Sequence, residues 1–186
     1  MTATRSKLLL AFLLLIALAG SANASHYSLS QVDFVTAAEK KAFARAGIHD
    51  TQVMLDWLQR QKDRTWIARQ TGLTEERLRE LAARCDLLRI TGIGPSIADA
   101  LMKSEILDVY DLARDEPSEL LSRLRVATRG TPMARLLPAE DTLATWIRDA
   151  KRLQPILDFD PWEVESLVKQ IKTGRVREAA PPIQMP

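Results

Sequence analysis

The residue types that most often build metal and disulfide sites are scarce in this sequence, which holds one cysteine and two histidines among 186 residues. A single cysteine, Cys85, excludes an internal disulfide, so stability has to come from packing. Cys85 falls on the apolar face of an expected helix, which predicts a buried, inert thiol. His26 and His49 lie far apart and outside any pattern with metal-ligand spacing. We therefore expect no bound metal ion.

Recognisable catalytic patterns are also missing. The sequence has no nucleophile elbow, no phosphate-binding Walker loop and no histidine beside a carboxylate at motif spacing. Adjacent acids such as Glu75-Glu76 and Glu140-Asp141 are explained by the positive ends of helices. We expect no enzymatic activity and no cofactor.

Aromatic residues make up only 5% of the chain, whereas hydrophobic residues as a whole make up 46%. That hydrophobic share is enough for a proper core in a chain of this length. Leucine, alanine, arginine and glutamate dominate, and all four are good helix formers. The composition predicts an all-α fold.

Long hydrophobic runs are confined to the start of the chain. Arg5 and Lys7 precede an unbroken apolar run over residues 8–19, and Ala22-Asn23-Ala24 is a small-x-small cleavage site. The run is shorter than the roughly 20 residues that a membrane span needs. We predict that residues 1–24 are a cleaved signal peptide and that the protein is periplasmic or secreted, with no stable transmembrane segment after cleavage. The alternatives are an uncleaved N-terminal membrane anchor and a buried helix.

A surplus of positive charge disappears once residues 1–24 are set aside. The whole chain carries 26 basic and 24 acidic side chains, and Arg5 and Lys7 are the only charged residues of the first 24. The remainder therefore holds 24 of each sign. Proteins that bind nucleic acids usually have a basic surplus, so this balance favours a protein partner.

The most informative local pattern is Gly92-Ile93-Gly94. Apolar residues at helical spacing flank it on both sides: Leu87, Leu88 and Ile90 before the glycines, and Ile97, Ala98 and Leu101 after them. This arrangement predicts a helix, a tight turn and a second helix. The pattern of Ile90, Thr91, Gly92, Ile93, Gly94 and Ala98 resembles the helix-hairpin-helix motif.

The resemblance to the helix-hairpin-helix motif implies that the turn amides contact a nucleic-acid phosphate. The candidate nucleic-acid-binding residues are then Arg89, Gly92, Ile93, Gly94, Ser96 and Lys103. Against this, the acidic Asp99 follows the glycines, whereas such hairpins commonly place a lysine or arginine just after them. The alternative is that the two glycines let two helices cross closely, with Pro95 starting the second helix.

A degenerate internal repeat runs through the chain with an offset of 58 positions. The segment 48–54 aligns with 106–112, so that Asp50 and Asp108 are both expected helix caps. Further along, Thr74 caps one helix, and Pro138 is expected in the first turn of another. We predict that each unit is a hairpin, a capped helix, a loop and a further helix, and that the two units form one helical domain over residues 28–153.

This repeat is similar to the domain-of-unknown-function family numbered 4332, over roughly residues 27–153. The residues that carry the resemblance are Tyr27-x-Leu29, Ala46-Gly47-Ile48, Thr71-Gly72-Leu73, the segment 87–94 and the segment 146–150. The family implies a paired helix-hairpin-helix fold and no established activity. Two positions depart from the repeat: Glu105 stands where the first unit has Gly47, and Phe34-Val35-Thr36 lacks the glycines of Gly92 and Gly94.

The composition changes after residue 153. Asp160-Pro161 is a helix-start signal, and the residues that follow predict an amphipathic helix ending near Gly174, within a segment 154–174 set apart from the helical domain. We expect this helix to pack on the core, the alternative being a partner surface. The tail 175–186 is expected to be disordered.

These observations predict an exported, non-catalytic helical protein that serves as a protein-interaction or scaffold module. The alternative is an exported nucleic-acid-binding protein that contacts phosphates through Gly92-Ile93-Gly94. The sequence identifies no specific partner for either function.

Overall fold

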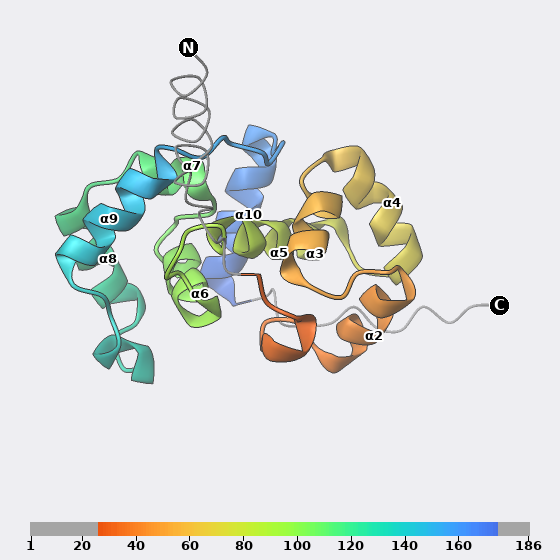
Figure 1. Cartoon of the computed structure of the whole chain (residues 1–186), viewed down its shortest axis with the longest axis horizontal. Helices are drawn as coiled ribbons and strands as arrows, with labels where there is room; N and C mark the ends of the chain where they lie inside the picture. The colour runs from red at the N-terminus through yellow and green to blue at the C-terminus, as the bar shows by residue number, and fades with distance from the viewer. Residues whose placement is uncertain (1–25, 175–186) are drawn as a thin grey trace, which may run out of the picture.

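The computed structural model describes residues 26–174, and over this range the chain is all-helical (Figure 1). Between these residues there is no β-strand; the extended pairing is a single bridge between Ser28 and Asp50. The prediction of an all-α fold is confirmed. The predicted signal peptide, residues 1–24, and the predicted disordered tail, 175–186, lie outside the described residues.

The first unit contains four α-helices after a short 3₁₀ helix, η1 (Leu29–Gln31). The four are α2 (Ala37–Arg45), α3 (Thr51–Leu58), α4 (Gln61–Thr71) and α5 (Glu75–Leu87). The expected caps are in place: the Asp50 side chain accepts a hydrogen bond from the Val53 amide, and the Thr74 side chain accepts one from the Arg77 amide.

The second unit has the same order of helices. It contains α6 (Pro95–Lys103), α7 (Val109–Ala113), α8 (Pro117–Ala127), the 3₁₀ helix η2 (Pro132–Arg135) and α9 (Glu140–Ala150). The expectation for Pro138 is wrong: α9 starts at Glu140 with Ala139 at the N-cap position, so Pro138 lies before the helix. It ends the loop after η2 rather than occupying the first turn.

The backbone of the two units repeats at the predicted offset of 58 residues. The end of α2 and the end of α6 are closed by the same type of backbone hydrogen bond, between residues five positions apart. The Ile48 N–H donates to the Phe43 C=O at 2.9 Å, and the Ile106 N–H donates to the Leu101 C=O at 3.0 Å. In the next helix, Asp50 accepts from Val53 at 2.8 Å, and Asp108 accepts from Asp111 at the same distance. The two units are therefore related in structure as well as in sequence.

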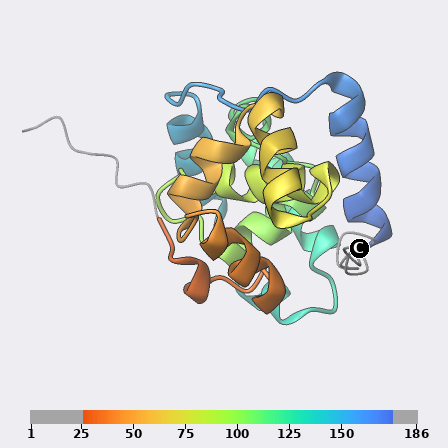
Figure 2. The ribbon, with the colours of Figure 1, turned by 90° about the vertical axis from the view of Figure 1, so that its right-hand side faces the viewer.

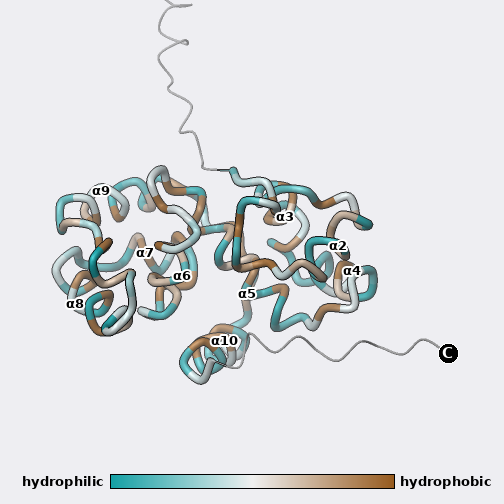
Figure 3. The backbone as a smooth tube through the Cα atoms, turned by 90° about the horizontal axis from the view of Figure 1, so that it is seen from below, coloured by the Kyte–Doolittle hydropathy of each residue, from teal (hydrophilic) through white to brown (hydrophobic). Residues whose placement is uncertain are grey.

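Helix α5 lies between the two units and contributes to both cores (Figure 1, Figure 3). Its Leu78 and Leu81 are fully buried among the side chains of the first unit, whereas Leu87 is fully buried in the second. Tyr27 and Phe34 pack against both clusters. The two units thus share one long helix, which fixes the position of the turn that follows it.

The last described helix, α10 (Pro161–Thr173), packs along the side of the two units (Figure 2). Its Leu167 is buried in the second core. At its first turn Glu163 is fully buried, with one carboxylate oxygen 2.6 Å from Arg79 and the other 3.6 Å from Arg64. The expectation that this helix packs on the core is confirmed, and its docking combines an apolar stripe with a buried ion pair.

The remaining findings concern the cysteine, clusters of metal ligands and membrane-spanning helices. Cys85 is buried, and burial raises the pKa of its thiol, which keeps the sulfur protonated. Within residues 26–174, no three metal-ligating side chains gather at one point. No helix in the same range is both long and apolar enough to span a membrane.

Candidate functional site

Residues 88–94 form a tight turn between α5 and α6, as the two glycines predict. Ile90 and Ile93 are buried, and the Ile93 amide donates to the Ile90 carbonyl at 3.0 Å. The two glycines differ. Gly92 has a φ of +91°, a conformation that side chains rarely adopt, whereas Gly94 has a φ of −95° and a ψ of 174°, which any residue adopts. We call residues 88–94 the glycine turn.

The close approach at the glycine turn is made to a tryptophan of the second unit. A Cβ atom on Gly92 would lie 3.1 Å from Nε1 of Trp146 on α9, while one on Gly94 would meet the Tyr27 hydroxyl at an ordinary 3.6 Å. Gly92 therefore lets the Trp146 side chain of α9 pack on the turn, whereas the packing interpretation assigns both glycines to the close crossing of two helices, the second of which starts at Pro95. Gly94 has no such requirement.

Arg89, a candidate phosphate ligand, is bound into the fold. Its guanidinium lies 2.6 Å from the carboxylate of Asp86 and donates to the Gln154 carbonyl at 3.1 Å. Asp86 also accepts the Val109 amide at 2.9 Å. Burial raises the pKa of Asp86, although both of these bonds favour its charged form. Arg89 thus ties the glycine turn to α7 and to the chain after α9.

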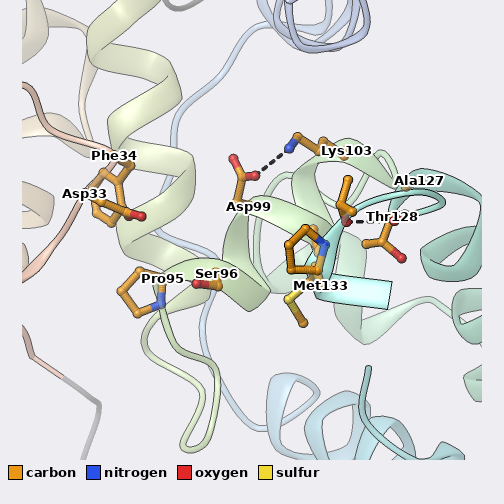
Figure 4. Close-up of a pocket in the computed structure, with 12 residues that line it drawn as sticks. Asp33, Phe34, Pro95, Ser96, Asp99, Lys103, Ala127, Thr128 and Met133 are labelled. Atoms are coloured by element: carbon orange, nitrogen blue, oxygen red, sulfur yellow. Dashed lines mark hydrogen bonds and ion pairs between the residues drawn. The ribbon is translucent and has the colours of Figure 1, made fainter. Parts of the chain in front are cut away.

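Two other candidates, Ser96 and Lys103, lie on one face of α6 and line a cavity of about 200 Å³. Figure 4 shows this cavity, with a dashed line between Lys103 and Asp99. Asp33 and Phe34 lie on one side of it, and Thr128 and Met133 lie on the other. The remaining lining residues are Pro95, Ala100, Ala127, Thr131 and Pro132. The cavity therefore lies between the turn before α2 and the end of α8.

The charges and hydroxyls in this cavity are mostly engaged by the fold. The Lys103 ammonium lies 2.7 Å from Asp99, which is also 2.8 Å from Arg84. Thr128 donates its hydroxyl to the Leu124 carbonyl at 2.7 Å. The arrangement offers hydrogen-bonding groups for a small polar molecule.

The six candidate residues do not form one cluster. Ser96 and Lys103 share the cavity, Arg89 is held by Asp86, and Ile93 is a core residue. Sequence reasoning missed the cavity walls at Asp33 and Thr128, because they come from segments far apart along the chain. The repeat aligns the turn before α2 with the glycine turn, but this alignment does not indicate what α6 faces.

A second surface, formed by α3 and α4, carries two exposed tryptophans. The rings of Trp57 and Trp66 stack with centroids 5.1 Å apart at an interplanar angle of 20°. Their side chains remain 38% and 43% exposed. Two basic residues, Lys62 and Arg69, lie one helical turn before and after Trp66 and are exposed. We call these four residues the tryptophan surface. The only sequence signal for it is that Trp57 and Trp66 fall on consecutive helices.

The family comparison covers both units. The family described as "Domain of unknown function (DUF4332)" matches residues 34–153, from the turn before α2 to three residues after the end of α9. No curated protein and no solved structure matches this chain. The matched range contains the glycine turn and the tryptophan surface and stops before α10. The chain belongs to the DUF4332 family.

Proposed function

We propose that this protein is an exported, non-catalytic helical module that binds another protein through the tryptophan surface. The observation that carries the proposal is the exposure of Trp57 and Trp66, which stack on each other while leaving a large part of each ring in contact with solvent. Tryptophan is among the residues most enriched at the centres of protein interfaces. Export is supported by the charged, apolar and small-residue pattern of residues 1–24.

The electrostatics of the glycine turn also favour a protein partner. Of the two cations expected to hold a phosphate, Arg89 is paired with Asp86 and Lys103 with Asp99. Each would have to leave a carboxylate to contact nucleic acid, and the chain after residue 24 has no net side-chain charge to compensate.

Site-specific photo-crosslinking tests the proposal. A benzophenone amino acid replaces Gln70, an exposed residue one turn after Trp66, and in a matched control it replaces Arg148, exposed on α9 of the other unit. Irradiation in envelope extract of the source organism is expected to give a discrete protein adduct from position 70 only, and the adduct is expected to disappear in the double variant Trp57→Ala, Trp66→Ala. Identical adducts from both positions, or an adduct that the double variant retains, would overturn the proposal.

A second candidate function, nucleic-acid binding at the glycine turn, is favoured by the start of α6. Gly94 provides no side-chain cap there and Pro95 has no N–H, so the first amides of the helix, those of Ser96 and Ile97, receive no bond from the N-cap residue. Residues 25–186 are titrated against labelled duplex and single-stranded DNA at two salt concentrations. Salt-sensitive binding that is lost in Gly94→Glu would support this function, and no binding at low salt would reject it.

A further inference from the structure

We propose that the tryptophan surface recognises an acidic protein segment, whose carboxylates pair with Lys62 and Arg69 while an apolar side chain between them covers the indoles. This inference rests on the proposed function and specifies the class of partner. It follows from three features of α3 and α4: the ring stack, the unpaired cations and their spacing.

The ring stack provides a rigid apolar platform. Trp57 comes from the last turn of α3 and Trp66 from the middle of α4, so each ring is held by a different helix. Stacking fixes the two rings against each other, which reduces the conformational entropy that a partner has to remove on binding. An apolar or aromatic side chain laid on this platform removes further indole surface from water.

The charge around the platform is positive. Lys62 precedes Trp66 by four residues and Arg69 follows it by three, so both share its face of α4. Neither cation has an ion pair within the described part of the chain. Their acidic neighbour on α4, Asp63, is already bound to Arg60 at 2.6 Å.

The acid nearest in sequence to Trp57 bonds to a neutral side chain of its own helix. Asp56 on α3 accepts a hydrogen bond from the Gln52 side chain at 2.7 Å. A bond from a neutral amide leaves Asp56 charged, so the surface that suits carboxylates lies over α4, where Lys62 and Arg69 are, and not over α3. An anionic partner with an apolar side chain complements these cations and the two indoles.

The spacing of the cations indicates the form of the acidic segment. Lys62 and Arg69 are seven positions apart in the helix, which corresponds to about 10 Å along α4. In the polyproline II conformation, which has three residues per turn and a rise of about 3.1 Å per residue, residues i and i+3 of a peptide lie on one face and about 9 Å apart. An acid–apolar–x–acid segment in this conformation presents both carboxylates on one face, one to each cation, and its apolar residue projects to the side toward the indoles. Nucleic acid fits less well, because its continuous phosphates need a longer basic track than two side chains.

The second unit offers a natural control surface. Its helices α7 and α8 correspond to α3 and α4 but contain no tryptophan, and their exposed aromatic residue, Tyr110, already lies against the Arg114 guanidinium at 5.1 Å. Tyr110→Ala therefore removes an exposed aromatic ring of the repeat without changing the proposed site.

Fluorescence anisotropy with a defined peptide tests the inference. The probe is a labelled 12-residue peptide with Glu-Phe-Ser-Glu at its centre and glycine–serine flanks, compared with the same peptide carrying glutamine for glutamate and with single-stranded (dT)12. We expect residues 25–186 to bind the glutamate peptide at least tenfold more tightly than the glutamine peptide. Binding is expected to weaken at least tenfold in Trp57→Ala, Trp66→Ala, and at least fivefold with loss of salt dependence in Lys62→Ala, Arg69→Ala. Tyr110→Ala is expected to bind normally.

A charge swap keeps the test decisive if the tryptophan variant folds poorly. The double variant Lys62→Glu, Arg69→Glu is expected to lose the glutamate peptide and to gain binding of a Lys-Phe-Ser-Lys peptide. Equal binding of the glutamate and glutamine peptides, unchanged binding by the alanine variants, or tighter competing binding of (dT)12 would each overturn the acidic partner. A crosslinked adduct at position 70 without charge-dependent peptide binding would reject this inference and leave the protein-interaction function intact, whereas failure of both experiments would reject both.

Discussion

The two units of this protein follow the same backbone path but close their turns with different side chains. Before α2, the Thr36 amide donates to the Glu39 carboxylate at 2.7 Å, and the Glu39 amide donates to the Thr36 hydroxyl at 3.2 Å. At the corresponding positions before α6 stand Gly94 and Ile97, so this reciprocal cap is missing. The first turn is stabilised by polar side chains, and the second by the packing of Trp146 on Gly92.

After α2 and α6 the two units again share a backbone conformation but differ in the residue that adopts it. Gly47 has a φ of +77°, and its counterpart Glu105 keeps a φ of +67°, the one non-glycine residue with positive φ in the described chain. The backbone conformation has been retained although the residue suited to it has changed. The path of the chain is therefore less variable than the side chains that stabilise it, and substitutions at matched positions measure each contribution.

The largest effect is expected at the glycine turn. Gly92→Ala places a side chain at a φ of +91° and 3.1 Å from Trp146, and we expect a loss of about 2–3 kcal/mol in the free energy of unfolding. Gly94→Ala is the matched control, expected to cost only about 0.5–1 kcal/mol, because Gly94 is the N-cap residue of α6 and alanine is a poorer N-cap than glycine. Urea unfolding followed by circular dichroism measures both. Equal losses in the two variants would contradict the distinct roles of the two glycines.

The stability of the turn before α2 is expected to depend on Glu39. Burial alone would raise the pKa of Glu39, but Arg77, 2.7 Å away, and the Thr36 bonds hold that pKa below its ordinary 4.5. Glu39→Gln is expected to lower the free energy of unfolding by about 2 kcal/mol at pH 7. Because a lowered pKa contributes stability above pH 4.5 that is lost as the pH falls through it, the difference between parent and variant is expected to shrink below pH 4.5.

Glu76, a partly exposed acid on α5, provides the control for Glu39. Glu76 lies 3.4 Å from Arg79 and is 48% exposed. Glu76→Gln is expected to change the free energy of unfolding by less than about 0.5 kcal/mol. A deficit of Glu39→Gln that stays constant from pH 7 to pH 3 would show that its cause is packing rather than charge.

Equal effects are expected where the two units are most alike. Asp50→Ala and Asp108→Ala each remove a cap with a 2.8 Å bond, and each is expected to cost about 1 kcal/mol. Asparagine at either position retains the acceptor and is expected to restore most of the loss. Thermal unfolding of the four variants checks this. Losses that differ by more than about 1 kcal/mol between the two positions would show that caps of the same geometry contribute unequally to the free energy of unfolding.

Local chemistry explains which parts of this structure could be predicted from the sequence. The caps at Asp50 and Asp108, the helix start at Pro161 and the turn around Gly92 each depend on residues within a few positions of one another. The repeat added long-range information, because it related two segments that fold alike. Fold class and unit structure follow from such signals.

The candidate sites depend partly on local ion pairs, which helical spacing reveals, and partly on the angle between helices, which it does not. Asp86 precedes Arg89 by three residues and Asp99 precedes Lys103 by four, spacings at which ion pairs form on a helix, so the sequence does indicate that both cations are paired. The stack of Trp57 on Trp66 requires the angle between α3 and α4. Glu105 was recognised as a departure from Gly47, but the alignment did not reveal that the backbone keeps its left-handed conformation there.

The smallest effect is expected at Glu105, where the second unit can be made to match the first. Glu105→Gly relieves a φ of +67° but removes the ion pair with Lys172, 2.6 Å away and about half exposed on both sides, so we expect a net stabilisation of about 0.5 kcal/mol. Glu105→Gln removes only the ion pair and is expected to be no more stable than the parent. Thermal unfolding at 0.05 M and 0.5 M salt separates the two contributions, because the gain from glycine is conformational and persists at high salt, whereas the ion pair is screened. If Glu105→Gly proves less stable than Glu105→Gln, then the left-handed backbone at this position is not strained, and the second unit has adapted to its glutamate.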